Sequence, residues 1–268
     1  MIVTFYECLT AAINEFIIYG FDSQDRLDYW VKELRKTAVK SLVTPQKLQN
    51  ELERALKGAF DRLVTKGGLV NKDVTRFTVD RLKPKMRAEL DRRILASVNL
   101  IKFNREESIS NMLRRFSGWA TSIPIGGSKV VDKKEEKKQI KKELGMLPFK
   151  ERRVIIDQTH KLIANINEIV ALDNGAIAAK WHSNWKQSGY NYREDHKELD
   201  ENIYLIQNNW AQKDGYVKPK DGYTSNVVAP GEEVYCRCRY KYLYRVSQLP
   251  DEMVTQKGKE ALQSKKIY

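Results

Sequence analysis

Apolar residues recur at helical spacing through the first third of the chain, in three separate stripes. The first stripe begins at Phe5 and ends before Gly20, and the second begins at Leu27. The third follows Thr44 and Pro45, the expected N-cap and first residue of a helix. These stripes predict three amphipathic helices with a shared apolar core. The apolar positions are Phe5, Leu9, Ala12, Ile13, Phe16, Ile17, Leu27, Trp30, Val31, Leu34, Leu48, Leu52, Ala55, Leu56, Ala59, Phe60 and Leu63.

The sequence of the middle of the chain predicts a further helix, then a loop and a highly charged segment. A glycine pair after Lys66 breaks the pattern, and a further helix is expected to reach residue 116, with an interruption near Pro84. Residues 117–131 are rich in Gly, Ser and Pro and predict a loop that docks through its large apolar residues. Residues 132–143 are almost entirely charged, which fits either an exposed helix or a mobile basic segment.

The second half of the chain predicts a long helix and then short strands. Apolar residues keep helical spacing from Ile155 to Val170, and the aromatic, Gly and Asn content rises after Trp181. The strand-like segments are 203–206, 227–229 and 234–245. The expected fold class is α+β and predominantly helical, with a short antiparallel sheet. The expected domains are a basic helical region at 1–147, an α+β domain at 148–249 and a tail at 250–268.

The segment 234–245 separates into two faces if it is read as a strand. Cys236, Cys238, Tyr240, Tyr242 and Tyr244 share one face, and the other carries Arg237, Arg239, Lys241 and Arg245. Successive charges on the second face are roughly 6.6 Å apart in a strand. This row of cations suits a polyanion, and it equally suits a solvated edge strand whose charges prevent pairing with other chains.

Charge adds a candidate partner to this picture. The 268 residues carry a net charge of +13, with a pI near 9.5, which indicates an acidic partner such as nucleic acid. Residues 51–150 account for +11 of that charge. No apolar run is long enough for a membrane span, and the first residues do not resemble a secretory signal.

The basic region predicts contacts to the phosphates of double-stranded DNA, without sequence preference. An ordinary solvated helix surface is the competing interpretation. The candidate DNA-contacting residues are Arg76, Arg81, Lys83, Lys85, Arg87, Arg92, Arg93, Arg114, Arg115, Arg239, Lys241 and Arg245.

Three cysteines do not make a disulfide framework, and a reducing compartment is expected. Two cysteines and two histidines could hold zinc, namely His182, His196, Cys236 and Cys238. The Cys-x-Cys spacing differs from that of zinc fingers, and a flat strand would hold the sulfurs too far apart for one ion. A nucleophilic cysteine with a histidine base lacks a protease signature. We therefore expect reduced, packed thiols and no cofactor.

Several of these segments occur in an order that resembles a known family. The Ile- and Asn-rich helix at 154–170 precedes Ala178–Ser183, then Tyr192–His196, and finally a Pro-Gly turn that leads into Cys236–Cys238. This order resembles the phage Mu F-like head morphogenesis domain of minor head proteins, over roughly residues 148–245. The family's usual Gly soon after the histidine is replaced here by Glu201 or Asn202. The positions that match the family motif are Arg193, His196, Cys236, Arg237 and Cys238, and we expect their role to be structural.

The resemblance implies a virion protein of a tailed phage, assembled in the host cytoplasm and bound in several copies around the portal vertex. It would act in head morphogenesis and genome ejection without being an enzyme. The implied partners are the portal protein, packaged double-stranded DNA and other head or internal virion proteins.

Two other functions stay open at this point. The family's fold is distantly related to ADP-ribosyltransferases, so an enzyme that modifies host proteins is one alternative, with Glu232 or Glu233 in the place of a catalytic glutamate. A generic DNA-binding module is the other.

Overall fold

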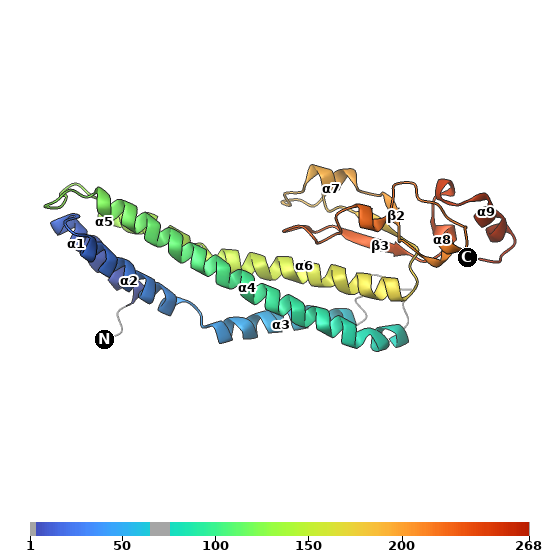
Figure 1. Cartoon of the computed structure of the whole chain (residues 1–268), viewed down its shortest axis with the longest axis horizontal. Coiled ribbons are helices and arrows are strands. Elements are labelled where there is room, and N and C mark those ends of the chain that lie inside the picture. Colours follow the sequence, from blue (N-terminus) through green and yellow to red (C-terminus); the bar gives the residue numbers. More distant parts are fainter. Residues whose placement is uncertain (1–3, 65–75, 268) are drawn as a thin grey trace. The chain divides into compact units, whose positions relative to one another are not determined.

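The computed structural model describes residues 4–64 and 76–267, and it is about 65% helical (Figure 1). Its contacts form two compact units. Unit 1 comprises the described residues up to Leu52 together with Ala96–Val154, and unit 2 comprises the described part of Glu53–Leu95 and the residues from Ile155 on. The predominantly helical α+β class is confirmed.

These units divide the chain differently from the expected domains at 1–147, 148–249 and 250–268. Three long helices contribute residues to both units, which sequence composition alone does not reveal. They are α3 (Pro45–Val64), α4 (Arg76–Ser122) and α6 (Leu147–Asp173).

Unit 1 contains α1 (Phe5–Tyr19), α2 (Gln24–Ser41) and α5 (Lys133–Gly145), packed with the second half of α4. The start of α1 is fixed by a capping box, in which Thr4 and Glu7 exchange side-chain hydrogen bonds to each other's backbone N–H groups. Gly20 ends α1 and Ser23 caps α2, as the sequence predicts. Phe16 and Phe116 meet edge to face in the core, with ring centroids 5.8 Å apart.

The Gly- and Pro-rich connection after α4 docks on the end of α1. Backbone N–H groups of Gly126 and Ser128 donate to the carbonyls of Tyr19 and Ile17, at 3.0 and 2.9 Å. The charged segment that follows is a helix, α5, capped by Asp132 and anchored by its buried Ile140. The connection therefore docks through its backbone and the buried Ile123, whereas Ile125 is exposed. Residues 117–122, expected to belong to the loop, continue α4 instead. The charged segment is a helix and not a mobile segment.

The helical part of unit 2 packs the end of α3 and the start of α4 against α6 (Figure 1). Met86, Leu90, Leu162 and Ile166 are fully buried there. The expected interruption near Pro84 is wrong, because α4 continues through this proline without a break. The glycine pair after Lys66 lies outside the described residues.

Unit 2 also holds a three-stranded antiparallel sheet in the order β2-β1-β3. The strands are β1 (Ala178–His182), β2 (Ile203–Leu205) and β3 (Arg239–Leu243). Trp181 of β1 lies opposite Tyr240 of β3 and is completely buried. Shorter helices surround the sheet: α7 (Glu194–Glu198), α8 (Trp210–Lys213), α9 (Gln256–Gln263) and three 3-10 turns at 224–226, 246–248 and 251–253.

The strand predictions hold only in part. The segment 203–206 corresponds to β2, but 227–229 is not a strand, and only residues 239–243 of the expected strand 234–245 pair with β1. Strand β1 itself was missed, because its alanines read as a continuation of the preceding helix. The segment after 250 contributes Met253 and Val254 to the core around the sheet.

Candidate functional site

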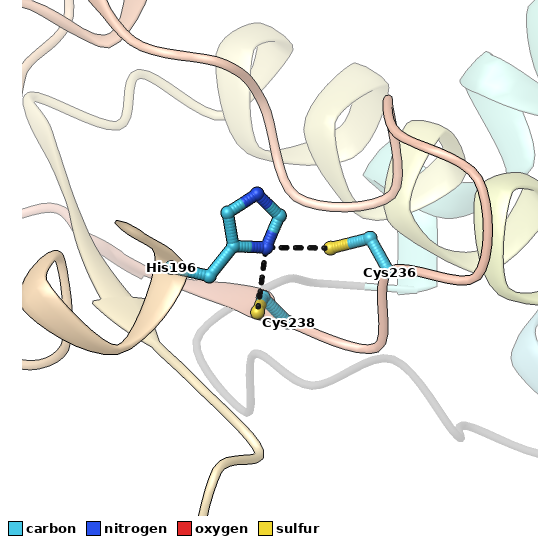
Figure 2. A group of neighbouring side chains, drawn as sticks. All are labelled: His196, Cys236 and Cys238. Carbon is cyan, nitrogen blue, oxygen red and sulfur yellow. Dashed lines mark hydrogen bonds between the residues drawn. The ribbon is translucent and has the colours of Figure 1, made fainter. Parts of the chain in front are cut away.

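Two cysteines and one histidine of unit 2 converge on a buried point beside the sheet (Figure 2). His196 lies in α7, and Cys236 and Cys238 lie in the loop that leads into β3. Nδ1 of His196 is 3.6 Å from the sulfur of Cys236 and 3.6 Å from the sulfur of Cys238. The three residues are between 3% and 7% exposed, so bulk water is largely excluded from the cluster.

The cysteines meet because the expected strand is wrong at this point. Tyr235 has a φ of 62°, in the left-handed region that an extended strand does not allow. The turn is held from α6, since the N–H of Tyr235 donates to Asp157 at 2.6 Å. In a flat strand the two sulfurs would stand apart, whereas this loop brings both to one ring nitrogen.

Side chains from two further segments hold the backbone of the loop. The hydroxyl of Tyr190 accepts from the N–H of Arg237 at 3.2 Å, and the amide of Asn184 donates to the carbonyl of Arg237 at 3.0 Å. The guanidinium of Arg237 lies 5.3 Å from the centre of the Tyr190 ring. The backbone of Arg237 therefore supports the position of the cysteines on either side of it.

Glu233 lies on the opposite side of the histidine ring from the sulfurs. One of its carboxylate oxygens is 3.0 Å from Nε2 of His196 and also pairs with Arg193. Neither Nε2 nor that oxygen has a well-aligned hydrogen bond among the described residues. Arg193 donates in addition to the carbonyl of Val234, at 3.3 Å. A chain of contacts thus runs from Arg193 through Glu233 and His196 to the sulfurs.

The two thiols differ in their protonation. A hydrogen bond from the Cys238 thiol lowers the pKa of Cys236, and the same bond, together with burial, raises the pKa of Cys238. The N–H of Gly231 also donates to the sulfur of Cys236, at 3.4 Å. Trp181 packs edge-on against His196, with ring centroids 5.5 Å apart.

His182 does not join the cluster, so the four residues named as possible zinc ligands do not all converge. Nδ1 of His182 instead lies 3.1 Å from a carboxylate oxygen of Glu201. The other three candidates, His196, Cys236 and Cys238, are brought together.

Four of the five positions of the family motif belong to one connected cluster, and Arg237 holds the loop between the two cysteines. Glu233 was missed as the partner of His196, as was Asp157 as the anchor of the turn. The short Arg-x-x-His spacing could have suggested a shared acidic partner for the two cations, but no sequence signal marks Asp157.

The candidate DNA-contacting residues of unit 2 mostly have partners. Ion pairs join Arg81 to Asp173, Lys83 to Asp80, Arg87 to Asp91, and both Arg92 and Arg93 to Glu89. Arg239 donates to the side chain of Asn184 at 3.4 Å. Lys85, Lys241 and Arg245 are exposed and have no acidic partner in the part of the chain that the structure describes. The side chain of Arg76 lies outside the described residues.

Unit 1 carries the other cations. Arg115 pairs with Glu143 at 3.1 Å, and Arg114 is exposed.

A cleft of about 430 Å³ between α1 and α5 is lined by five lysines and by Tyr6. The ammonium of Lys137 lies 3.7 Å from the centre of the Tyr6 ring. The lysines are Lys133, Lys134, Lys137, Lys138 and Lys141. The sequence analysis did not name these lysines individually, and only the net charge of residues 51–150 indicated a basic surface here.

No protein-family model, curated protein or solved structure matches the chain. Among the described helices, none combines the length and the apolar character that crossing a bilayer requires.

Proposed function

We propose that this chain is a minor head protein of a tailed phage, bound at the portal vertex and in contact with packaged DNA. It would act in head morphogenesis and genome ejection, without enzymatic activity of its own. The proposal rests on the resemblance to Mu F-like head proteins, and on how the residues that carry this resemblance lie in unit 2.

One observation supports the proposal most directly. Arg193 and His196 are some forty residues from Cys236 and Cys238 in the sequence, yet contacts through Glu233 connect all four. A chance similarity between scattered residues has no reason to bring them into one connected cluster. Their arrangement supports a shared structural role, as the resemblance implies.

Contact with DNA is supported by the lysine-lined cleft of unit 1. Its five lysines lie within about two turns of α5, and one of them, Lys138, pairs with Glu135 at 3.5 Å. A duplex carries one negative charge per about 1.7 Å of its axis, so such a face can displace several counterions at once. The exposed Arg114 belongs to the same unit.

An ADP-ribosyltransferase-like enzyme is less well supported. A catalytic glutamate must face its substrate, whereas the carboxylate of Glu233 is engaged with Arg193 and His196. Transfer of a label from NAD to protein, abolished by Glu233→Gln, would favour the enzyme.

The location of the chain in intact particles tests the head-protein proposal. We expect several copies per particle at the portal vertex, detected by quantitative mass spectrometry and by labelled density in electron microscopy. Particles that lack the protein should package or eject DNA poorly, and wild-type protein supplied in trans should restore them. Normal packaging and ejection without the protein would contradict the proposal.

The salt dependence of duplex binding tests the DNA contact separately. The observed affinity should fall as salt rises, with a log–log slope of about −0.9 for each phosphate contacted. Replacing Lys133, Lys137 and Lys141 by Gln should reduce that slope. The matched control removes equal charge from exposed lysines of unit 2, Lys213, Lys259 and Lys266. Equal loss in both triple variants would show a general charge effect and remove the cleft from the proposal.

A further inference from the structure

Three side chains that commonly bind metals surround one point in unit 2. We propose that Nδ1 of His196 and the sulfur atoms of Cys236 and Cys238 bind one zinc ion (Figure 2). The argument uses only the geometry within unit 2, so it stands whether or not the chain is a head protein.

The distances match those of a tetrahedral zinc site. Zinc–sulfur bonds of about 2.3 Å and zinc–nitrogen bonds of about 2.05 Å, meeting at the tetrahedral angle, place sulfur and nitrogen about 3.6 Å apart. Both distances from Nδ1 of His196, to the sulfurs of Cys236 and Cys238, are 3.6 Å. All three ligand atoms lie within 4.8 Å of one another. A zinc ion therefore fits between them with little movement of the side chains.

A hydrogen-bonded arrangement explains the same geometry less well. One imidazole nitrogen has either a single proton or a single lone pair, so it makes one strong hydrogen bond in its ring plane. Here two sulfurs approach the same nitrogen at equal distance. A cation at the common centre contacts the nitrogen and both sulfurs together, whereas a proton on the nitrogen can point to only one of the two sulfurs.

The surroundings of the ligands also suit a metal. Histidines that bind metals usually direct their other ring nitrogen to a carboxylate, which fixes the ring and makes the ligand more basic. Nε2 of His196 faces Glu233 at 3.0 Å, and Arg193 holds that carboxylate. The N–H of Gly231 approaches the sulfur of Cys236 at 3.4 Å, a contact that stabilises a thiolate.

The types of ligand atom favour zinc over other ions, and the place of the site between two segments indicates a structural role. Two thiolates and an imidazole favour zinc over magnesium or calcium, which prefer oxygen. The ion would join α7 to the loop before β3, two segments with little apolar core of their own. Three protein ligands leave a fourth tetrahedral position for water. Because the binding energy of such a site is also folding energy, the metal would stabilise this part of unit 2.

Metal analysis of the full-length chain tests this inference. The protein is purified in zinc-supplemented buffer without chelators, and its zinc content is measured by mass spectrometry. We expect one zinc ion per chain, lost in Cys236→Ser, Cys238→Ser and His196→Ala. The matched control is Cys8→Ser, which removes a buried free cysteine of unit 1 and should leave the zinc content unchanged.

A second measurement protects the test against variants that fail to fold. Cobalt added to metal-free wild-type protein should give a thiolate charge-transfer band and the intense visible bands of tetrahedral cobalt. Wild-type protein that takes up neither zinc nor cobalt would overturn the inference. So would rapid alkylation of Cys236 in the presence of saturating zinc, which would indicate a nucleophile with His196 as its base.

Discussion

The carboxylate of Glu233 lies 3.0 Å from Nε2 of His196, on the side of the ring opposite the two cysteine sulfurs. Arg193 pairs with the same carboxylate and so holds it in place. Glu233 is not one of the proposed zinc ligands, but its contact with Nε2 determines which ring nitrogen of His196 faces the sulfurs. The tautomer with its proton on Nε2 leaves the lone pair of Nδ1 directed at the metal position.

Glu233→Gln should therefore weaken zinc binding without abolishing it. The neutral amide can still contact Nε2 but no longer raises the basicity of the ring, and loss of such a partner typically costs about 10- to 100-fold in metal affinity. Competition with a chromophoric chelator measures the affinity.

Glu194→Gln is the matched control for this variant. Glu194 lies in the same short helix as His196, is exposed and pairs with Lys197 at 3.2 Å. The zinc affinity of Glu194→Gln should equal that of the wild type. Equal affinities in all three proteins would show that Glu233 does not orient the ligand.

The helices of this chain were predictable because their signals are local. Capping residues such as Ser23 and Thr44 stand directly before the apolar stripes that they start, and Gly20 stands directly after one. Strand β1 was not predictable in this way, since Ala178 and Ala179 have no strand preference of their own. They form a strand because β2 and β3 pair with them from segments far along the chain, Leu205 and Leu243 with Ala178, and Tyr204 and Tyr242 with Ala179.

The candidate site was predictable in its members but not in its geometry. The sequence identified His196, Cys236 and Cys238 as possible metal ligands. The expected flat strand, however, would have kept the two cysteine sulfurs too far apart to share an ion. The turn at Tyr235 depends on a hydrogen bond to Asp157, 78 residues earlier. Such a long-range contact overrides the local strand preference of the tyrosine-rich segment, and no periodicity in the sequence indicates it.

A buried carboxylate should make unit 2 sensitive to acid. Burial alone would raise the pKa of Glu89, but hydrogen bonds from Arg92, Arg93 and Asn165 outweigh it, so the pKa lies below its usual value. A lowered pKa in the folded state means that the stabilisation is complete above the unfolded pKa, about 4.3, and is lost as the pH falls through the folded value. Glu89→Gln should cost about 1–3 kcal/mol at neutral pH.

Chemical denaturation at several pH values measures this effect. The difference between wild type and Glu89→Gln should shrink as the pH falls below about 4.3. Asp91→Asn removes an exposed ion pair with Arg87 and should change the free energy of unfolding by less than about 1 kcal/mol at any pH. A difference for Glu89→Gln that stays constant down to strong acid would show that the charge of Glu89 is not responsible.

Two adjacent glycines in the connection after α4 should respond differently to the same substitution. Gly126 and Gly127 both have positive φ, at 89° and 84°. A Cβ on Gly126 would meet open space, whereas one on Gly127 would overlap the backbone carbonyl oxygens of Ile17 and Ile18 at the end of α1. Gly126→Ala should cost about 1–2 kcal/mol for backbone strain alone. Gly127→Ala should cost at least about 2 kcal/mol more, because the connection must move off α1.

Thermal unfolding of the two alanine variants checks this difference, since each serves as the other's control. The melting temperature should fall more for Gly127→Ala than for Gly126→Ala. Equal melting temperatures would mean that the connection does not dock on α1 as closely as its hydrogen bonds to Ile17 and Tyr19 indicate.

Pro84 stands exposed inside α4, where it should reduce the stability of the helix. A proline in a helix interior has no N–H for the carbonyl four residues earlier, and its ring crowds that carbonyl. Pro84→Ala should therefore stabilise the chain by up to about 3 kcal/mol, measured by chemical denaturation. Lys85→Ala, at the next exposed position, should change stability by no more than about 0.5 kcal/mol. A lower stability of Pro84→Ala would contradict the prediction and would mean that the proline contributes to seating the neighbouring Leu82 and Met86 in the core of unit 2.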